Sequence, residues 1–434
     1  MLLMVAFLFS ACDHTAELSN DRTVGANPTL PEPTTSWIPT LNIAPAVGWK
    51  DGGQPMPAAD LGVAPFSAGL DHPRWIYVLP NGDVLVAESA APPQPENNTG
   101  IKGWVADMVL KKAGSAVPSA NRITLLRDAD GDGQAEVRTT FISSLNSPIG
   151  MALVGSDFYV ANTDSVMRYP YHEGDTQITA KGEKIADLPA GPINHHWTKN
   201  LIASPDGKTL YVTIGSNSNV AENGIDKETN RAAILSIDLS GSDHQPKLFA
   251  SGLRNPNGLA WQKDTGALWT VVNERDELGS DLVPDYLTHV QAGGFYGWPY
   301  SYWGQHVDDR VAPQRPDLVT KAIVPDYALG NHVAALGLTF STGSLLPERY
   351  HDGAFIGEHG SWNREPRSGY KVVFVPFSSG QPSGPPIDIL GGFVNSDGEA
   401  KGRPVGVAMA KDGALLVADD VGNVVWRVAP KTAQ

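Results

Sequence analysis

Apolar and polar residues alternate along this chain in short runs that end in turn residues. The alternation predicts β-strands, and the Asn-Gly and Asp-Gly pairs between runs predict antiparallel pairing. One unit occurs six times: a turn with Pro or Gly, an apolar strand, a tight turn, and a second apolar strand that ends in small or acidic residues. The six copies span residues 72–88, 147–162, 200–215, 255–273, 335–358 and 403–419.

Further apolar runs lie between these units, for example at residues 122–126, 233–237 and 370–375. Six units of about four strands each predict an all-β fold, a six-bladed β-propeller with loop insertions. A β-sandwich with coincidental repeats is the alternative. One stretch, residues 103–112, has a helical pattern, and we expect it on an insertion.

Composition narrows the class of protein. The chain has 434 residues, 41% of them hydrophobic, which is enough to bury a core. Its formal net charge of -15 argues against nucleic acid as a partner, because nothing offsets the repulsion by phosphates. An anionic small ligand in a locally basic pocket stays compatible with this charge.

The chain begins with an apolar run that ends in Ser10, Ala11 and Cys12, the single cysteine. Small residues before one cysteine at the end of such a run are typical of a bacterial lipobox, in which the thiol is acylated. This pattern predicts a periplasmic protein that touches a membrane only through a lipid anchor. An ordinary cleaved signal is the alternative, because Phe9 stands where Leu is usual.

The remaining boundaries follow from composition. Residues 1–12 are predicted to be targeting sequence, too short to span a bilayer as a helix. Residues 13–45 are rich in Thr, Pro, Asn and Ser, and we expect a flexible tether. Residues 46–434 are expected to form the propeller, a catalytic domain.

Candidate chemistry lies just before the repeated units, where inner strands enter from one end of the propeller. His195 and His196 precede the third unit, and a neutral imidazole is the commonest general base. Arg254 and Asn255 begin the fourth unit, and Arg403 begins the last, which closes in two aspartates. Guanidinium groups in one channel suit a ligand with several negative charges. The alternatives are a histidine that caps a blade and an Arg-Asn pair that braces a loop.

Two loops are rich in aromatic residues. In residues 292–299 glycines allow backbone carbonyls to approach a ligand or a hard cation, and the aromatic rings suit stacking on a flat ring or a sugar. An interblade core is the alternative for this loop. Residues 357–364 combine polar and aromatic side chains, including Trp362 and Arg364, in a way that packing alone does not explain.

The segment with Asp128, Asp130 and Asp132 is a separate candidate. Acidic residues at alternate positions with glycine turns resemble the first half of a Ca²⁺ loop, which predicts a structural calcium site. Glu136 comes too early to be the usual bidentate twelfth ligand. A solvated acidic hairpin tip is the alternative.

Several common motifs are absent from the sequence. It has no Gly-x-Gly-x-x-Gly after a strand, no phosphate-binding Gly-x-x-x-x-Gly-Lys loop, no Gly-x-Ser-x-Gly elbow and no cysteine cluster. These absences argue against nicotinamide, nucleotide triphosphate, serine-hydrolase and zinc-ribbon functions.

Taken in order, these motifs resemble those of the soluble quinoprotein glucose dehydrogenase and sorbosone dehydrogenase family. The resemblance covers most of the propeller and rests on a histidine followed by residues 204–207, and on residues 253–259, 295–299 and 402–419. Residues 357–364 resemble the sorbosone branch more closely than the glucose branch.

The resemblance implies a propeller that binds pyrroloquinoline quinone (PQQ) and Ca²⁺ at the channel mouth. It would oxidise a sugar or a hydrated sugar aldehyde by hydride transfer and pass electrons to a periplasmic or membrane acceptor. The implied roles are His196 as base, Arg254 as charge stabiliser, and Asn255, Arg403, Asp419, Arg364 and Trp362 as cofactor contacts. The backbone oxygens of Gly297, Trp298 and Pro299 would hold the cofactor calcium.

Three positions depart from the glucose enzyme's pattern: His195 replaces Asp, Val405 replaces a second cofactor-binding Arg, and Leu145 replaces Gln. These departures imply that Arg364 or Arg367 anchors the cofactor instead, that PQQ binds weakly, or that glucose is not the substrate. Two other functions stay open for a propeller. One is a Ca²⁺-dependent lactone hydrolase, and the other is a non-catalytic binder of carbohydrate or protein.

Overall fold

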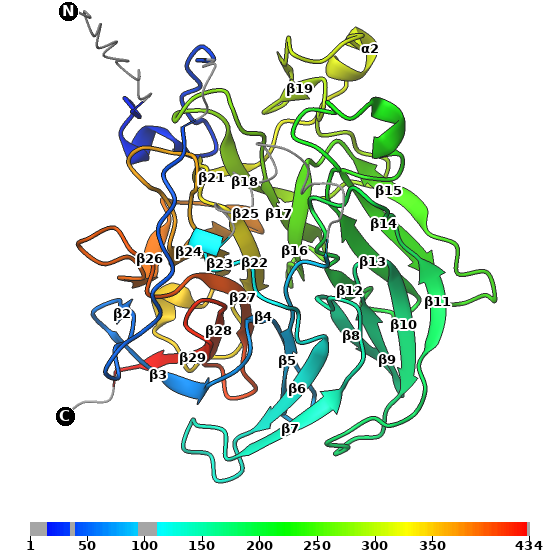
Figure 1. Cartoon of the computed structure of the whole chain (residues 1–434), viewed down its shortest axis with the longest axis vertical. Coiled ribbons are helices and arrows are strands. Elements are labelled where there is room, and N and C mark those ends of the chain that lie inside the picture. Colours follow the sequence, from blue (N-terminus) through cyan, green and yellow to red (C-terminus); the bar gives the residue numbers. More distant parts are fainter. Residues whose placement is uncertain (1–14, 35–39, 94–110, 432–434) are drawn as a thin grey trace, which may run out of the picture.

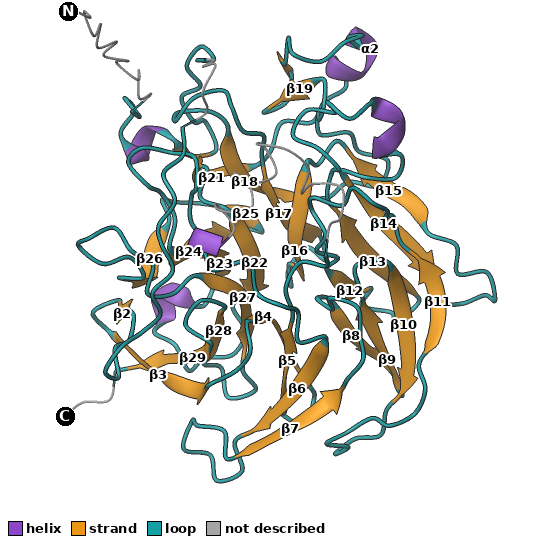
Figure 2. Cartoon of the chain, viewed as in Figure 1, coloured by secondary structure: helices purple, strands orange, loops and turns teal. Residues whose placement is uncertain are grey.

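The computed structural model of this protein describes residues 15–34, 40–93 and 111–431. Six antiparallel sheets stand around a common axis, and each turns its first strand inward (Figure 1). Strands dominate the regular structure (Figure 2). The predicted six-bladed β-propeller is therefore confirmed, and the β-sandwich alternative is wrong.

The first three blades are continuous in sequence, and each sheet follows chain order. Blade 1 contains β4 (Pro73–Val78), β5 (Val84–Glu88), β6 (Arg122–Arg127) and β7 (Val137–Ile142). Blade 2 contains β8 (Met151–Val154), β9 (Asp157–Ala161), β10 (Ser165–Pro170) and β11 (Glu183–Asp187). Blade 3 contains β12 (Leu201–Ala203), β13 (Thr209–Ile214), β14 (Ala233–Asp238) and β15 (Lys247–Ser251).

The other three blades each gain a strand from the N-terminal part of the chain. Blade 4 contains β16 (Asn255–Trp261), β17 (Leu268–Asn273), β18 (Pro284–His289), β21 (Tyr327–Asn331) and β1 (Val24–Gly25). Blade 5 contains β22 (Ala335–Phe340), β23 (Gly353–Glu358), β24 (Lys371–Ser378), β26 (Ile387–Gly391) and β2 (Met56–Pro57). Blade 6 contains β27 (Pro404–Met409), β28 (Leu415–Asp419), β29 (Val424–Pro430) and β3 (Leu61–Ala68).

Short elements lie outside the blades. They are the hairpin β19 (Ser301–Tyr302) and β20 (His306–Val307), strand β25 (Gln381–Pro382), helix α2 (Pro316–Val319), and the 3₁₀ turns η1 (Asn20–Arg22), η3 (Ile225–Glu228) and η4 (Glu348–Tyr350). Among the helices of the described ranges, none has the length and apolarity needed to cross a bilayer. The predicted helix at residues 103–112 falls almost wholly outside those ranges.

The six repeated units of the sequence are the inner hairpins of the six blades. Their recurring glycine has a packing reason, because inner strands of neighbouring blades approach too closely for a side chain. A Cβ on Gly337 would lie 2.3 Å from the carbonyl oxygen of Val405, and one on Gly406 would lie 2.8 Å from that of Arg74. Gly150 and Gly258 meet the next inner strand in the same way.

Apolar clusters fill the spaces between the blades. Within the described residues, each pair of neighbouring blades shares one cluster. Strand β5 shows how one strand serves two of them: Val84 and Val86 face blade 6, whereas Leu85 and Ala87 face blade 2. Both faces of such a strand are buried, which is why its sequence is continuously apolar.

The N-terminal segment differs from the predicted flexible tether. Strand β1, within residues 13–45, pairs with the outer edge of blade 4. Strands β2 and β3, within the predicted propeller, pair with the outer strands of blades 5 and 6, and β3 closes the ring by pairing with β29. Exposed edge strands offer unpaired N–H and C=O groups, and this segment satisfies them. The predicted boundary at residue 46 is therefore displaced. Cys12, with its predicted lipidation, lies outside the described residues.

Candidate active site at the channel mouth

Most of the predicted site residues lie at the end of the propeller where the inner strands begin. We call this end the channel mouth. In an antiparallel hairpin, the first residue of the inner strand lies opposite the last residue of the second strand. Asn255 accordingly pairs with Asn273, and Pro404 pairs with Asp419. The residues before β12, β16 and β27 therefore face the same end as those after β13, β17 and β28.

His196 lies in the loop before β12, and its ring is held by Ser216 after β13. The Nδ1 atom is 2.8 Å from the Ser216 carbonyl oxygen and 3.0 Å from Ser216 Oγ, which itself donates to the carbonyl of Ser218. A carbonyl oxygen can only accept, so Nδ1 carries the hydrogen of the neutral ring. The lone pair is then on Nε2, which is the tautomer that a general base needs.

The electrostatic surroundings keep this ring neutral. Burial, and then the positive charge of nearby Arg254, hold the pKa of His196 well below 6.5. Lys199, with no exposed surface, donates through Nζ to the carbonyl oxygens of His196 and Trp197 at 3.3 and 3.2 Å. These hydrogen bonds of Lys199 fix the loop that carries the base.

Arg254 immediately precedes β16, and its carbonyl accepts the Ser216 N–H, which joins it to the His196 support. All five N–H donors of its guanidinium are engaged: Nε and one Nη bind Asn219, another Nη binds backbone carbonyls of Asn273 and Glu274, and Asp276 lies 2.8 Å away. The hydrogen-bond donors of Arg254 therefore all bind protein groups. What Arg254 offers a ligand is its charge and its planar face.

Asn255, beside His196 and Arg254, has an unused hydrogen-bond acceptor. Its Oδ1 atom is buried and has no hydrogen-bond partner among the described residues. Gly215 lies between Asn255 and His196, and a Cβ there would come within 2.4 Å of both Asn255 Oδ1 and His196 Cβ. Only glycine allows these two side chains to approach each other so closely, and Asn255 keeps an unused acceptor there. These features fit a bound ligand with an N–H or O–H donor.

Arg403 and Asp419 lie together at the start of blade 6. Arg403 is 3% exposed, its guanidinium is 5.0 Å from the Tyr370 ring centroid, and one Nη donates to the Ala44 carbonyl at 3.2 Å. Its Nε atom is buried without a partner among the described residues. The group therefore has an open donor.

Asp419 is fully buried and already surrounded by donors. Its oxygens accept N–H groups from Trp49, Trp426, Gly422 and Arg403. Burial raises its pKa to about 6 despite these bonds. This differs from the predicted cofactor contact, because four protein donors occupy the carboxylate, and its contact with the Arg403 backbone makes it a support for that residue.

The loop after β23 also differs in part from expectation. Arg364 is buried and donates to the carbonyls of Ser280 and Pro366 at 3.0 and 2.7 Å, and Arg367 donates to those of Asn42 and Ile43. Both guanidinium groups hold loops together, and a role of either in replacing the missing cofactor arginine stays a prediction. Trp362 is 39% exposed and presents an open aromatic ring.

The predicted calcium carbonyls lie in the buried segment Gly297–Pro299. The Gly297 oxygen accepts the Ser301 N–H at 2.9 Å, and the Pro299 oxygen accepts from Arg275 Nη at 3.0 Å. A guanidinium at Pro299 competes with a cation, so this oxygen does not fit a calcium ligand. The Gly297 oxygen faces only a neutral amide and keeps a second lone pair.

A buried charged group at the mouth was missed by sequence reasoning. Asp420 follows β28 and is 2% exposed, and its Oδ2 atom binds Arg74 and, at 2.9 Å, His359 Nε2. His72 Nε2 lies 3.6 Å from the same oxygen. Burial lowers the pKa of His359 to about 4, and the histidines and Arg74 hold the pKa of Asp420 far below its usual range. Only the polar character of residues 357–364 and the paired aspartates hinted at it.

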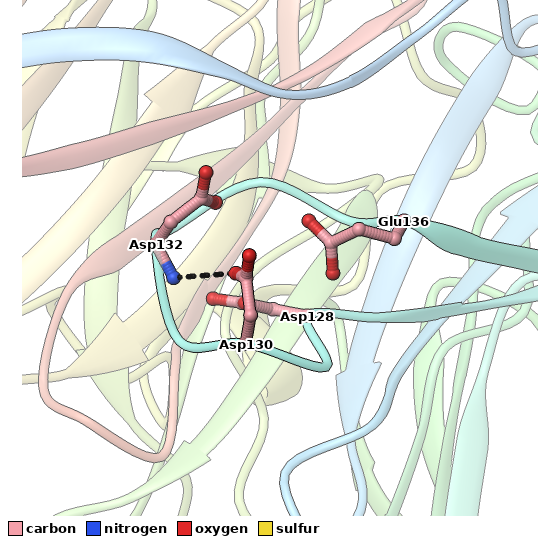
Figure 3. A group of neighbouring side chains, drawn as sticks. All are labelled: Asp128, Asp130, Asp132 and Glu136. Carbon is pink, nitrogen blue, oxygen red and sulfur yellow. Dashed lines mark hydrogen bonds between the residues drawn. The ribbon is translucent and has the colours of Figure 1, made fainter.

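The acidic loop lies away from the mouth, on the β6–β7 turn of blade 1. Asp128, Asp130, Asp132 and Glu136 each bring an oxygen within 4.8 Å of the others (Figure 3). Backbone N–H groups of Gly131 and Gly133 orient Asp128 at 2.7 and 2.9 Å. Glu136, which comes too early in the loop to be the usual bidentate twelfth ligand, joins the group. The arrangement is compatible with a structural cation and equally with a solvated turn.

Comparison with known proteins places the chain in a family. A profile described as TrAA12-like matches residues 114–289 and 316–431, and the chain belongs to this family. It is 24% identical to the pyrroloquinoline quinone-dependent pyranose dehydrogenase of Coprinopsis cinerea, over 84% of this chain and 53% of that protein. It is 26% identical to the aldose sugar dehydrogenase of Escherichia coli, over 66% of this chain and 75% of that protein.

Solved structures share the fold. The holo form of the PQQ domain of the Coprinopsis cinerea pyranose dehydrogenase superposes with a TM-score of 0.69 at 20% identity, covering 87% of this chain and 97% of that one. A calcium structure of the Trichoderma reesei family AA12 enzyme gives 0.70 at 20% identity, covering 90% and 99%.

Proposed function

We propose that this protein is a PQQ-dependent dehydrogenase that oxidises a sugar or a hydrated sugar aldehyde. The observation that carries the proposal is the fixed tautomer of His196, which leaves the lone pair on Nε2, in a residue that lies beside Arg254 and Asn255 at the channel mouth. The dehydrogenases among the relatives support the reaction class. A substrate of the sorbosone kind is the finer proposal, supported by residues 357–364 of the sequence.

The residues present fit PQQ in two respects. PQQ carries three carboxylates, and Arg403 offers a buried, unpartnered Nε for one of them. Asn255 Oδ1 would accept a hydrogen bond from an N–H or O–H donor of the bound ring. Arg254 would add positive charge next to the reacting centre without donating a hydrogen bond.

When bound, the quinone supplies the acceptor for the hydride that leaves the substrate carbon. His196 takes the hydroxyl proton on Nε2, and its Nδ1–H to the Ser216 carbonyl becomes a charge-assisted bond as the ring turns cationic. Arg254 disfavours that cation, which keeps the base free before reaction and favours loss of the proton afterwards.

The proposal includes calcium as a second cofactor. In the predicted segment the Gly297 carbonyl keeps a lone pair for a cation, whereas the Pro299 carbonyl faces Arg275. It also includes export to the periplasm, acylation at Cys12 and electron transfer to a periplasmic or membrane acceptor, supported by the N-terminal sequence pattern. Mass spectrometry of membrane-extracted protein would test the acylation.

A reconstitution titration tests the function. Apo-protein is titrated with PQQ with and without Ca²⁺, while the absorbance change and dye-linked oxidation of aldoses and sugar aldehydes are followed. We expect saturable PQQ binding and oxidation of at least one sugar. If the protein binds no PQQ at micromolar concentration, the result favours lactone hydrolysis or carbohydrate binding. Both are assayed on the same sample.

A further inference from the structure

We propose that Arg74, on the inner strand of blade 1, is a second carboxylate-binding guanidinium at the channel mouth, paired with Arg403 of blade 6. The inference deepens the proposed function and rests on it. Its ligand is a flat molecule with at least two carboxylates, of which PQQ is the one tested.

The first observation is an unused donor. Among the described residues, Arg74 and Arg403 are the arginines whose Nε is buried without a hydrogen-bond partner. Arginine binds carboxylates side-on through Nε and one terminal nitrogen, so an open Nε is the group that such a ligand needs. A buried N–H left unpaired costs free energy, which a bound carboxylate would recover.

The second observation is where the side chain lies. The pairing of β4 with β5 shifts register between Pro73 and Trp75, and this bulge contains Arg74. Bulges redirect a side chain out of the regular alternation. The Arg74 guanidinium lies 5.9 Å from the ring centroid of Trp197, the residue after the proposed base. Arg74 therefore reaches the part of the mouth where His196 lies.

The third observation connects Arg74 with Arg403. Gly406 of β27 packs against the Arg74 backbone, so the two inner strands are in contact. Asp420 joins the two arginines, since its carboxylate binds Arg74 and its backbone N–H donates to the Arg403 carbonyl at 3.4 Å. Both guanidinium charges act on His359, which also contacts Asp420.

The hydrogen bonds of Arg74 leave its Nε available to an anion. Asp420 is its carboxylate partner, reached through one terminal nitrogen, and His72 and His359 share that carboxylate. The carboxylate is thus surrounded by one guanidinium and two imidazoles. Other buried arginines near the mouth, among them Arg231, Arg254 and Arg364, are bound to protein groups instead.

The test is a comparison of two ligands on the full-length apo-protein by isothermal titration. PQQ carries the carboxylates, and its trimethyl ester has the same ring without those charges. We expect Arg74→Gln to weaken PQQ binding by about 10- to 100-fold and to change ester binding little. Equal weakening of both ligands, or no weakening of PQQ, would overturn the inference.

Three controls separate other outcomes. Wild-type protein that binds no PQQ would refute the proposed function itself. Arg127→Gln removes an arginine paired with Asp83 on the same blade and should leave PQQ affinity unchanged. Should Arg74→Gln fail to fold, Arg74→Lys keeps a charge for Asp420 but lacks Nε, and we expect it to weaken PQQ binding while sparing the ester. A lysine variant with wild-type PQQ affinity would also overturn the inference.

Discussion

At the scale of single residues, the tautomer of the proposed base depends on a backbone atom. The Ser216 carbonyl fixes the tautomer of His196, and no side-chain substitution removes that oxygen. Burial and Arg254 then keep the ring neutral. The backbone therefore fixes the tautomer of His196, whereas burial and charge lower its pKa. The role of the residue and its pKa can be tested separately.

Replacing the base tests its role. We expect His196→Ala to lower kcat/KM by about 10²- to 10⁴-fold, the usual contribution of a positioned general base, while PQQ still binds. The neighbouring exposed His195 provides the matched control, and His195→Ala should retain most of the activity. Steady-state oxidation with a dye acceptor and a PQQ titration measure the two effects. Full activity in His196→Ala would show that another group takes the proton.

The pH dependence tests the electrostatics. Only neutral imidazole accepts the proton, so activity is present above the pKa of His196 and is lost as pH falls through it. Because that pKa is lowered, the plateau of kcat/KM should extend well below pH 6.5. A profile of kcat/KM from pH 4.5 to 8 measures the acid limb. The lowered pKa of His196 would be contradicted if the fall of kcat/KM were centred at or above pH 6.5 and if no variant of another histidine abolished that fall.

At the scale of elements, the sequence predicted the hairpins well because local signals define them. Alternation marked the strands, and Gly337 and Gly406 marked the close approach of inner strands. Arg74 and Asp420 were not predicted as partners, since they come from opposite ends of the chain and meet only when β3 closes the ring. The protein partners of Arg364 and Asp419 were not predicted, because composition shows a charge but not which protein groups bind it.

The acidic turn between β6 and β7 gives a prediction at this scale. Four carboxylates within 4.8 Å repel one another unless a cation joins them. Ca²⁺ at about 100 times its Kd should stabilise the fold by about 2.7 kcal/mol, seen as a rise in Tm of a few degrees. We expect Asp130→Asn to reduce that rise, and Asp243→Asn, an exposed aspartate elsewhere, to keep it. Thermal melts with calcium and with chelator decide between a cation site and a solvated turn.

At the scale of the whole molecule, the ring divides its chemistry between opposite blades. Blades 3 and 4 hold His196 and Arg254, whereas blades 6 and 1 hold Arg403 and Arg74. A ligand at the channel mouth would meet the base and Arg254 from blades 3 and 4, and Arg403 and Arg74 from blades 6 and 1. The N-terminal segment reinforces blade 6, since Ala44 binds Arg403 and Trp49 binds Asp419. Sequence composition could not show this, because a Pro- and Thr-rich segment looks the same docked or free.

A buried acid gives the prediction for global stability. Glu358, at the end of β23, is 1% exposed, its Oε2 atom has no partner among the described residues, and burial raises its pKa from 4.5 to about 8. Between these two values the folded state holds a proton that the unfolded state has released. The carboxyl therefore destabilises the fold increasingly as pH rises, by about 1.4 kcal/mol per pH unit, and the effect levels off above pH 8.

Glu358→Gln removes the titration while keeping the shape of the side chain. We expect the variant to gain free energy of unfolding relative to wild type between pH 5 and 8, with no further gain above. Denaturant unfolding at four pH values measures the difference, in which the contributions of the buried histidines and of Lys199 cancel because both proteins share them. Glu348→Gln, an exposed glutamate in the same blade, should show no such trend. A constant difference across this range would mean that Glu358 is ionised in the fold, which would require a cationic partner stronger than Lys371, the nearby positive charge that lowers its pKa.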